Sequence, residues 1–206
     1  MVEIRIFEPE SAPLDLYRFR YAIYVEEMRR KQFYASHKDR TITDPLDATA
    51  VNIVAIDGDA ICGCVRVNFL RRGPIGEYQS LYGIDRLPES EQQASSITTR
   101  LMVGRAWRRT TVTSRLITTI YEYALRRDIL TDYIDCNRHL IPFFERLGYR
   151  KRFTCNHPEY GDVTVMSIDV RDRAHLRKIA SPFLPILSRW MDESDENART
   201  AAFEPA

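Results

Sequence analysis

The stretch "ITTRLMVGRAWRRTTVTSRL", residues 97–116, has the pattern of a strand, a basic turn and the start of a helix. Its first seven residues are β-branched or apolar and end at Gly104, and apolar residues recur at helical spacing from Leu116 onward. The turn between them is rich in Arg and Thr. Such a turn at a helix N-terminus suits an anion, because free backbone N–H groups and the positive end of the helix dipole both point at it. Two interpretations stay open: a cradle for a diphosphate or phosphopantetheine group, or an ordinary connection with solvated arginines.

The composition limits the classes of function. The chain has 206 residues, 44% of them hydrophobic, which is enough to bury a core. Thirty basic and 29 acidic side chains give a net charge of +1, so no overall field would recruit nucleic acid. No apolar run is long enough to span a membrane, and the N-terminus lacks the features of a signal peptide. The four cysteines show no metal-ligand spacing. We expect a cytoplasmic protein without a metal site.

The order of elements predicts an α+β fold, a mixed sheet with helices on both faces. Strands are expected at residues 2–7, 51–56, 60–70, 97–103, 131–136, 149–153 and 161–170. Helices are expected at residues 13–28, 114–127, 138–148 and 172–179, with a long loop over 29–47 and a variable excursion over 71–96. Residues 1–190 then form a single domain, and 191–206 form a flexible tail.

Some charged residues stand out against this pattern. Arg66 falls inside an apolar strand and must find a carboxylate or a ligand, because burying its charge unpaired is costly. Arg18 and Arg20 fit helix-surface charges. Asp44 and Asp47 flank Pro45 and Leu46, which suits either a capped turn or a functional loop. We expect His139, His157 and His175 on the surface or in loops.

Two of these segments resemble the GCN5-related N-acetyltransferase superfamily. They are "LMVGRAWRRTTVTSRLI", the strand, basic turn and helix, and the more specific "IDCNRHLIPFFERLGYRK". The resemblance implies a splayed sheet and a binding site for the phosphopantetheine arm of an acyl thioester. By position, the residues of that site are Met102, Val103, Arg108, Arg109, Thr110, Thr111, Val112, Thr113 and Ser114.

The chain departs from this superfamily at three positions. Thr111 and Thr113 stand where glycines are usual, so the loop for the diphosphate of coenzyme A is narrower. Phe144 stands where many members have a tyrosine acid, and a phenyl ring cannot donate a proton to a departing thiolate.

A narrower resemblance covers most of residues 14–183. The segments "FRYAIYVEEM", "DPLD", "GCVRV" and "HPEYGDVTVMSIDVRDRAHLRKIASPF" resemble acyl-homoserine lactone synthases and, more closely, long-chain N-acyl amino acid synthases. Those synthases take their acyl group from an acyl carrier protein. The lactone synthases have glutamates where this chain has Ile42 and Ile97, which favours the amino-acid branch. The functional residues carried over by position are Arg20, Tyr24, Asp44, Asp47, Arg66 and Arg100.

The resemblance implies that a neutral amine attacks the acyl thioester directly. A backbone N–H near Met102 or Val103 would stabilise the oxyanion, and Asp47 or Asp44 would act as base or, alternatively, hold the loop through arginine salt bridges. Arg66 or Arg100 could clamp the acceptor carboxylate. Residues expected to bind substrate are Arg20, Tyr24, Arg66, Arg100, Cys136, Phe143 and Phe144. For the two phenylalanines, together with Tyr149 and Phe153, ordinary core packing is the alternative to an acyl tunnel. Cys136 could also form an acyl-enzyme or be an inert buried thiol.

We expect no permanently bound cofactor, and partners limited to an acyl carrier protein and a small amino-acid acceptor. The donor is then acyl-phosphopantetheine on the carrier, with acyl coenzyme A as the alternative. Carrier proteins are typically acidic, so basic side chains should receive them. The candidates are Arg105, Arg108, Arg109, Arg115, Arg150, Lys151 and Arg152. Two rival functions remain, a coenzyme A dependent N-acetyltransferase on a small amine and a catalytically silent acyl-ligand binder.

Overall fold

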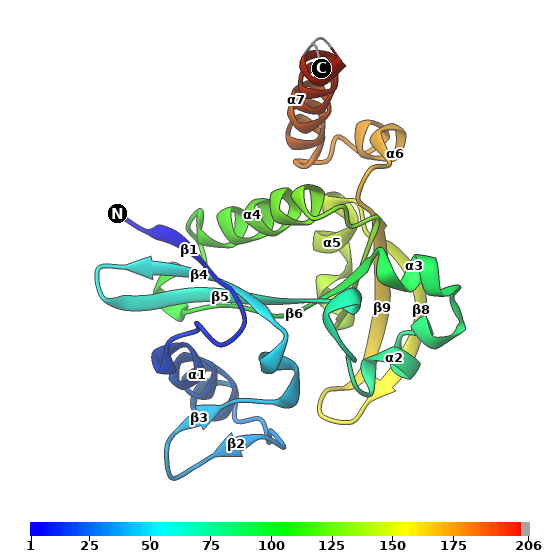
Figure 1. Ribbon diagram of the computed structural model, residues 1–206. Helices are drawn as coiled ribbons and strands as arrows, with labels where there is room; N and C mark the ends of the chain where they lie inside the picture. Colours follow the sequence, from blue (N-terminus) through cyan, green and yellow to red (C-terminus); the bar gives the residue numbers. More distant parts are fainter. Residues whose placement is uncertain (203–206) are drawn as a thin grey trace.

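The structure, a computed structural model, describes residues 1–202, with side chains described through residue 196. Within these residues a seven-stranded sheet has the order β1-β4-β5-β6-β7-β9-β8 (Figure 1). Its neighbours run antiparallel except β6 and β7, which are parallel. The strands of this sheet are β1 (Glu3–Phe7), β4 (Val51–Asp57), β5 (Ala60–Phe69), β6 (Ser95–Val103), β7 (Thr131–Cys136), β8 (Arg150–His157) and β9 (Gly161–Asp169).

Helices cover both faces of the sheet, as the sequence predicted. The helices are α1 (Leu14–Tyr21), α2 (Tyr78–Leu81), α3 (Glu89–Gln93), α4 (Val112–Arg126), α5 (Ile141–Leu147), α6 (Arg173–Lys178) and α7 (Leu184–Ala202). The apolar stripe of α4 packs with α5 and the start of α7 in the largest core cluster, whereas α1 lies across the opposite face of β4 and β5 (Figure 1). Burial of one apolar face on each side of the sheet is what stabilises this α+β architecture.

The sheet is splayed at its centre. β6 and β7 pair only where Ser95 to Ile97 face Thr131 to Tyr133. Beyond Ile97, β6 remains paired with β5, and beyond Tyr133, β7 remains paired with β9. Asp132 fastens the closed end, because Ser96 Oγ donates to its Oδ1 at 2.6 Å and Tyr149 Oη donates to its Oδ2 at 2.6 Å. Burial raises the pKa of this carboxyl to about 6.

The loop expected over residues 29–47 has more structure than its polar sequence suggested. It contains a small hairpin of β2 (Ala35–Ser36) and β3 (Thr41–Ile42), followed by a 3₁₀ turn over Pro45–Ala48. Asp44 caps that turn in a reciprocal arrangement with Asp47, which is the capping role weighed for this pair. The expected helix over 13–28 continues past α1 as a π-helical segment over Ala22–Glu27.

The expected tail begins inside a helix. α7 runs from Leu184 to Ala202, so the boundary at residue 190 does not coincide with the end of an element. Residues 203–206 lie outside the described residues, and the flexibility of 191–206 stays a prediction. No helix in the described part of the chain is long and apolar enough to cross a membrane.

Gly148, which ends α5, occupies a position that only glycine fits. Its φ is +125°, and a Cβ there would lie 2.6 Å from Leu176 Cδ2 and 3.0 Å from Ile168 Cδ1. We expect Gly148→Ala to lower the free energy of unfolding by about 2–4 kcal/mol, since backbone strain and overpacking add. Urea denaturation would measure this. The control is Gly58→Ala, where φ is +62° but a Cβ would meet nothing within 4 Å, so a loss of only about 1 kcal/mol is expected. Equal losses in the two variants would contradict the packing argument.

Candidate active site

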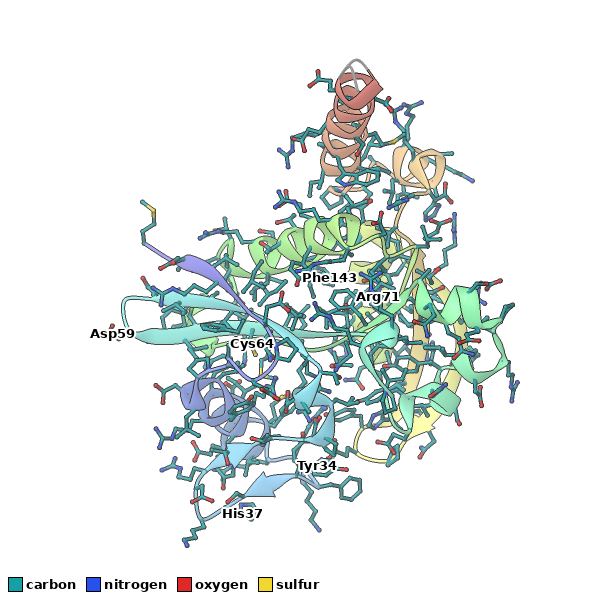
Figure 2. The ribbon with its side chains drawn as sticks, in the orientation of Figure 1. Tyr34, His37, Asp59, Cys64, Arg71 and Phe143 are labelled. Atoms are coloured by element: carbon teal, nitrogen blue, oxygen red, sulfur yellow. The ribbon has the colours of Figure 1, made fainter. Side chains whose placement is uncertain are left out.

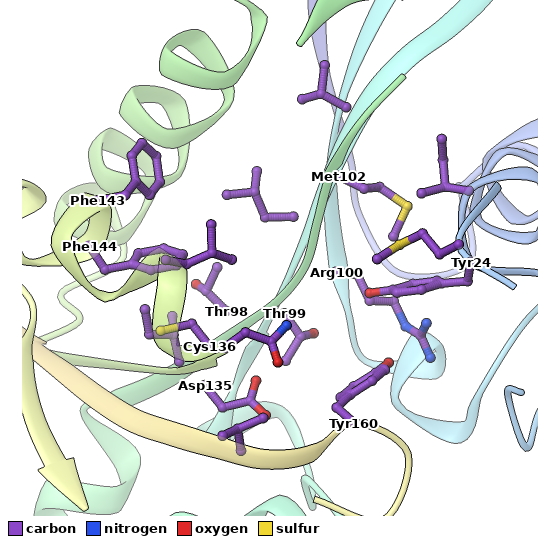
Figure 3. A pocket seen from close by; sticks show the side chains of 18 of the residues that line it. Tyr24, Thr98, Thr99, Arg100, Met102, Asp135, Cys136, Phe143, Phe144 and Tyr160 are labelled. Carbon is purple, nitrogen blue, oxygen red and sulfur yellow. The ribbon is translucent and has the colours of Figure 1, made fainter. Parts of the chain in front are cut away.

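A pocket of about 410 Å³ opens where β6 and β7 separate. Residues 98–103 of β6 form one wall, and residues 134–137 at the end of β7 form the other. Phe143 and Phe144 of α5 close the apolar end, while Tyr24 and Tyr160 border the opposite end (Figure 3). A concave, largely apolar cavity with a few polar groups is the usual form of a small-molecule site.

A bulge in β6 shapes this wall. Cys64 faces Met102 and Arg66 faces Thr99, so Val65 alone lies opposite both Arg100 and Leu101. Arg100 has a φ of +55°, which is uncommon for a residue with a side chain. Bulges re-aim side chains and bend the strand that carries them. Here the bulge turns β6 away from β7.

The edge of β6 beyond the bulge turns its backbone polar groups to the gap. Gly104 N–H donates to Cys62 C=O at 2.8 Å, which places Gly104 in register with β5. Because backbone groups alternate between the two edges of a strand, the N–H and C=O of Val103 point to the opposite edge. In agreement with this, Val103 C=O accepts a hydrogen bond from Arg108 Nε at 2.9 Å.

Behind the pocket lies a buried network of arginines and aspartates. Arg20 donates to both carboxylate oxygens of Asp47, at 2.8 and 2.9 Å, and Arg66 donates to Asp44 at 2.6 Å. Arg100 donates to Asp44 through two of its nitrogens. Burial alone would raise the pKa of Asp44, but Arg66 and Arg100 outweigh it and hold that pKa at about 2. The network anchors α1, the 3₁₀ turn, β5 and β6 to one another.

The network supplies the partner that the sequence required for Arg66, the carboxylate of Asp44. It also shows that the expectation for Arg20 was wrong. Arg20 is fully buried rather than a helix-surface charge, because the turn that carries Asp47 folds over its end of α1. Of the network, Arg100 alone lines the pocket; Arg20, Arg66, Asp44 and Asp47 do not. Both aspartates are engaged with arginines, so these contacts favour their scaffold interpretation, and their role as a base stays a prediction.

An aromatic stack forms the polar end of the pocket. Tyr24 stacks on Tyr160 with ring centroids 6.1 Å apart, and Tyr160 stacks on His157 at 4.4 Å. The guanidinium of Arg30 lies 5.2 Å from the centre of the Tyr160 ring. His157 is buried, not in a surface loop as expected, because β8 and β9 bring it against Tyr78.

The basic turn is partly occupied by its own contacts. Arg108 lines the pocket and forms an ion pair with Glu27 at 2.5 Å, in addition to its bond to Val103. Thr113 also lines the pocket. The other predicted phosphopantetheine residues of this turn do not line it: Arg109, Thr110, Thr111, Val112 and Ser114. Thr111 precedes α4 with no side-chain cap bond, and Thr110 Oγ1 accepts from Val112 N–H.

Only some of the residues that were predicted to bind the acyl chain line the pocket. Phe143, Phe144 and Cys136 line the pocket, whereas Tyr149 is buried against Asp132 and Phe153 is exposed. Burial raises the pKa of the Cys136 thiol to about 11, and its Sγ lies 3.7 Å from Met166 Sδ. A thiol in this state is a poor nucleophile, which favours packing over an acyl-enzyme role.

Sequence reasoning missed several residues of the pocket. Arg30, Leu101, Asp135 and Tyr160 line it, and none was singled out. Asp135 stood in the quoted strand "TDYIDC", where an acidic residue in a buried strand was an available signal. Among the described side chains no cluster of His, Cys, Asp and Glu could hold a metal ion.

Comparisons with solved structures identify the fold. The CoA-dependent acyl-homoserine lactone synthase BjaI, solved with SAM and isopentyl-CoA, matches with a TM-score of 0.67 and 17% identity over 88% of this chain and 91% of that one. The CoA-dependent acyl-homoserine lactone synthase MesI matches with a TM-score of 0.66 and 21% identity, over 86% and 95% of the two chains. Escherichia coli ElaA matches with a TM-score of 0.58 and 16% identity, over 82% and 100%.

Sequence comparison identifies the family. A comparison with curated protein sequences gave no match. The family described as "N-acyl amino acid synthase FeeM" matches residues 15–168, well over half of the chain. That range includes the arginine and aspartate network, the bulged strand β6, the basic turn and both walls of the pocket. The chain therefore belongs to the FeeM family of N-acyl amino acid synthases and is an N-acyltransferase.

Proposed function

We propose that this chain moves a fatty acyl group from the phosphopantetheine thioester of an acyl carrier protein to the amino group of an amino acid, giving an N-acyl amino acid. The observation that carries the proposal is the pocket between β6 and β7, where an apolar wall and a polar end meet beside a free strand edge. In the proposed reaction the acyl chain needs apolar surroundings and the charged acceptor needs polar ones, and both must lie next to the reacting carbonyl.

The proposed reaction uses the strand edge as its electrostatic element. The amine nitrogen attacks the thioester carbonyl, the C–N bond forms, and the negative oxygen of the tetrahedral intermediate accepts a hydrogen bond from Val103 N–H. The C–S bond then breaks and the thiolate leaves. With Phe144 in place of a tyrosine acid, the thiolate takes a proton from the nitrogen of the intermediate, directly or through water.

Arg30 is our candidate for the carboxylate of the acceptor. It lines the pocket, and among the described side chains it forms no ion pair with a carboxylate. Arg66 and Arg100 were the candidates from sequence, but their guanidinium groups already bind Asp44. A guanidinium without a carboxylate partner suits a planar carboxylate better than one whose donors are in use.

For the donor, the exposed basic turn supports a carrier protein. Arg105 and Arg109 are exposed at the turn between β6 and α4, next to the pocket. Three of the other expected docking residues have partners of their own: Arg150 pairs with Asp172, Lys151 pairs with Glu145, and Arg115 donates to Val2 C=O. Arg152 is exposed on β8. The cytoplasmic location expected from the sequence stays a prediction.

The donor is tested by steady-state kinetics with the same acyl group on a carrier protein and on coenzyme A, with a mixture of amino acids as acceptor. We expect a higher kcat/KM with the carrier-bound donor. In the double variant Arg105→Glu and Arg109→Glu, KM for that donor should rise about 10-fold or more, because like charges replace attraction to an acidic partner. The control is the double charge reversal Arg177→Glu and Lys178→Glu on α6, which lies at the other end of the molecule (Figure 1).

Two results would contradict this assignment. Equal KM values in the two double variants would remove the turn from carrier docking. Turnover with acetyl coenzyme A and none with any carrier-bound acyl group would select the second candidate, a coenzyme A dependent N-acetyltransferase. Arg108 at the pocket rim, close to the position expected for a diphosphate, is the observation that keeps this candidate open.

A further inference from the structure

Asp135 is an acidic residue of the pocket with no role in the network behind it. It lies near the end of β7 and lines the cavity, and Figure 3 shows its carboxylate in the space bordered by Thr99 and Tyr160. Its Oδ2 is buried and has no hydrogen-bond partner among the described residues. No ion pair to Asp135 is present among the described side chains either, unlike Asp44 and Asp47.

The nearest polar neighbours of Asp135 are a tyrosine and a histidine, and among the described side chains no Lys or Arg forms an ion pair with it. The buried hydroxyl of Tyr82 lies beside it and, as a hydrogen-bond donor, opposes the larger effect of burial on the pKa of Asp135. His157 is the other polar neighbour. Its Nδ1 accepts a hydrogen bond from Glu159 N–H at 3.1 Å, and its Nε2 lies 3.3 Å from Tyr78 Oη.

A partly buried carboxylate without a cationic partner costs free energy, and binding of a cation beside it offsets that cost. The proposed reaction brings a cation of the right size, because an amino-acid acceptor arrives as an ammonium ion. Tyr160 and Tyr24 border the same space, and the guanidinium groups of Arg30 and Arg100 already lie over their rings. We propose, on the basis of the function proposed above, that Asp135 binds the ammonium of the acceptor and removes its proton before attack on the thioester.

The proton can be followed through the reaction. An N–H bond of the ammonium breaks, and its proton passes to a carboxylate oxygen of Asp135, directly or through one water. The freed lone pair forms the C–N bond. A second amine proton leaves with the thiolate as the thiol, and Asp135 returns its proton to solvent when product leaves. Burial raises the pKa of Asp135, which makes this carboxylate a stronger base than an exposed aspartate.

The test compares Asp135→Asn with wild type on two acceptors. With an amino acid, we expect kcat/KM to fall about 100-fold or more, because the amide keeps the shape but neither pairs with an ammonium nor takes its proton. Hydroxylamine has a nitrogen that is neutral at pH 7 and needs no base. Hydroxamate formation from the same acyl donor should therefore stay within about 3-fold of wild type. The matched control is Asp59→Asn, the same change at the remote tip of the β4–β5 hairpin (Figure 2).

Each outcome separates the inference from the function on which it rests. Loss with the amino acid and retention with hydroxylamine supports the role of Asp135. An unchanged rate with the amino acid overturns it, and so does an equal loss with both acceptors, which would indicate damage to the fold or to donor binding. If wild type forms the hydroxamate but no amide with any amino acid, the proposed acceptor class fails instead.

Discussion

Asp47→Asn should lower the free energy of unfolding by about 3–5 kcal/mol, because it leaves the buried guanidinium of Arg20 without its counter-ion. The side chain of Arg20 is 0% exposed and that of Asp47 is 3% exposed. Asp47 also lies 3.4 Å from the second buried guanidinium, that of Arg66. Asparagine has nearly the same volume as aspartate, so no cavity forms. The loss in the free energy of unfolding therefore measures the effect of removing the charge. Urea denaturation at constant pH measures it.

The matched control is Asp15→Asn, in which the partner is again an arginine of α1. The Asp15 and Arg18 side chains are 70% and 56% exposed, and such surface pairs contribute at most about 1 kcal/mol. The account expects the Asp47 variant to be several-fold more destabilising than this control. Similar losses at the two sites would mean that the buried network does not hold the 3₁₀ turn against α1 and β5.

Val103→Pro should lower kcat by about 100- to 1,000-fold, because proline removes the N–H assigned to the oxyanion. The substitution is tolerable in this strand, since that N–H points to the gap and not to the β5 ladder. KM for the acyl donor should change little, because the N–H acts on charge that develops only in the transition state. Pre-steady-state and steady-state turnover of a carrier-bound acyl donor would separate the two parameters.

The control at this position is Val103→Thr, which has nearly the same shape and keeps the N–H. We expect it to stay within a few-fold of wild type. Binding of the unreacted donor to the proline variant shows whether the pocket is intact. A proline variant that binds donor and turns over at the wild-type rate would remove Val103 N–H from the mechanism.

Much of the fold follows from the sequence because its signals are local. The β-branched run that ends at Gly104 predicts β6, and the helical spacing from Leu116 predicts α4. From the sequence, Arg66 was expected to find either a carboxylate or a ligand, because an unpaired charge inside an apolar strand is costly, and in the structure its partner is Asp44. The family resemblance then identified Met102 and Val103, which line the pocket.

The missed features depend on contacts between distant segments. The burial of Arg20 depends on a turn that begins 24 residues later, at Asp44. The bulge at Arg100 depends on register with β5, which no local pattern encodes. β7 carries two acids, Asp132 and Asp135, and the sequence does not say which one faces the open part of the splay. That is decided by where the pairing of β6 and β7 ends.

The central claim, acyl transfer to the amine of an amino acid, is tested most directly by the mass of the product. The purified chain is incubated with a carrier-bound fatty acyl group and a mixture of ¹⁵N-labelled amino acids, and the organic extract is analysed by high-resolution mass spectrometry. The account predicts an N-acyl amino acid with the ¹⁵N label, at far lower yield with Asp135→Asn and unchanged with Asp59→Asn. Release of free fatty acid with no labelled amide would contradict it.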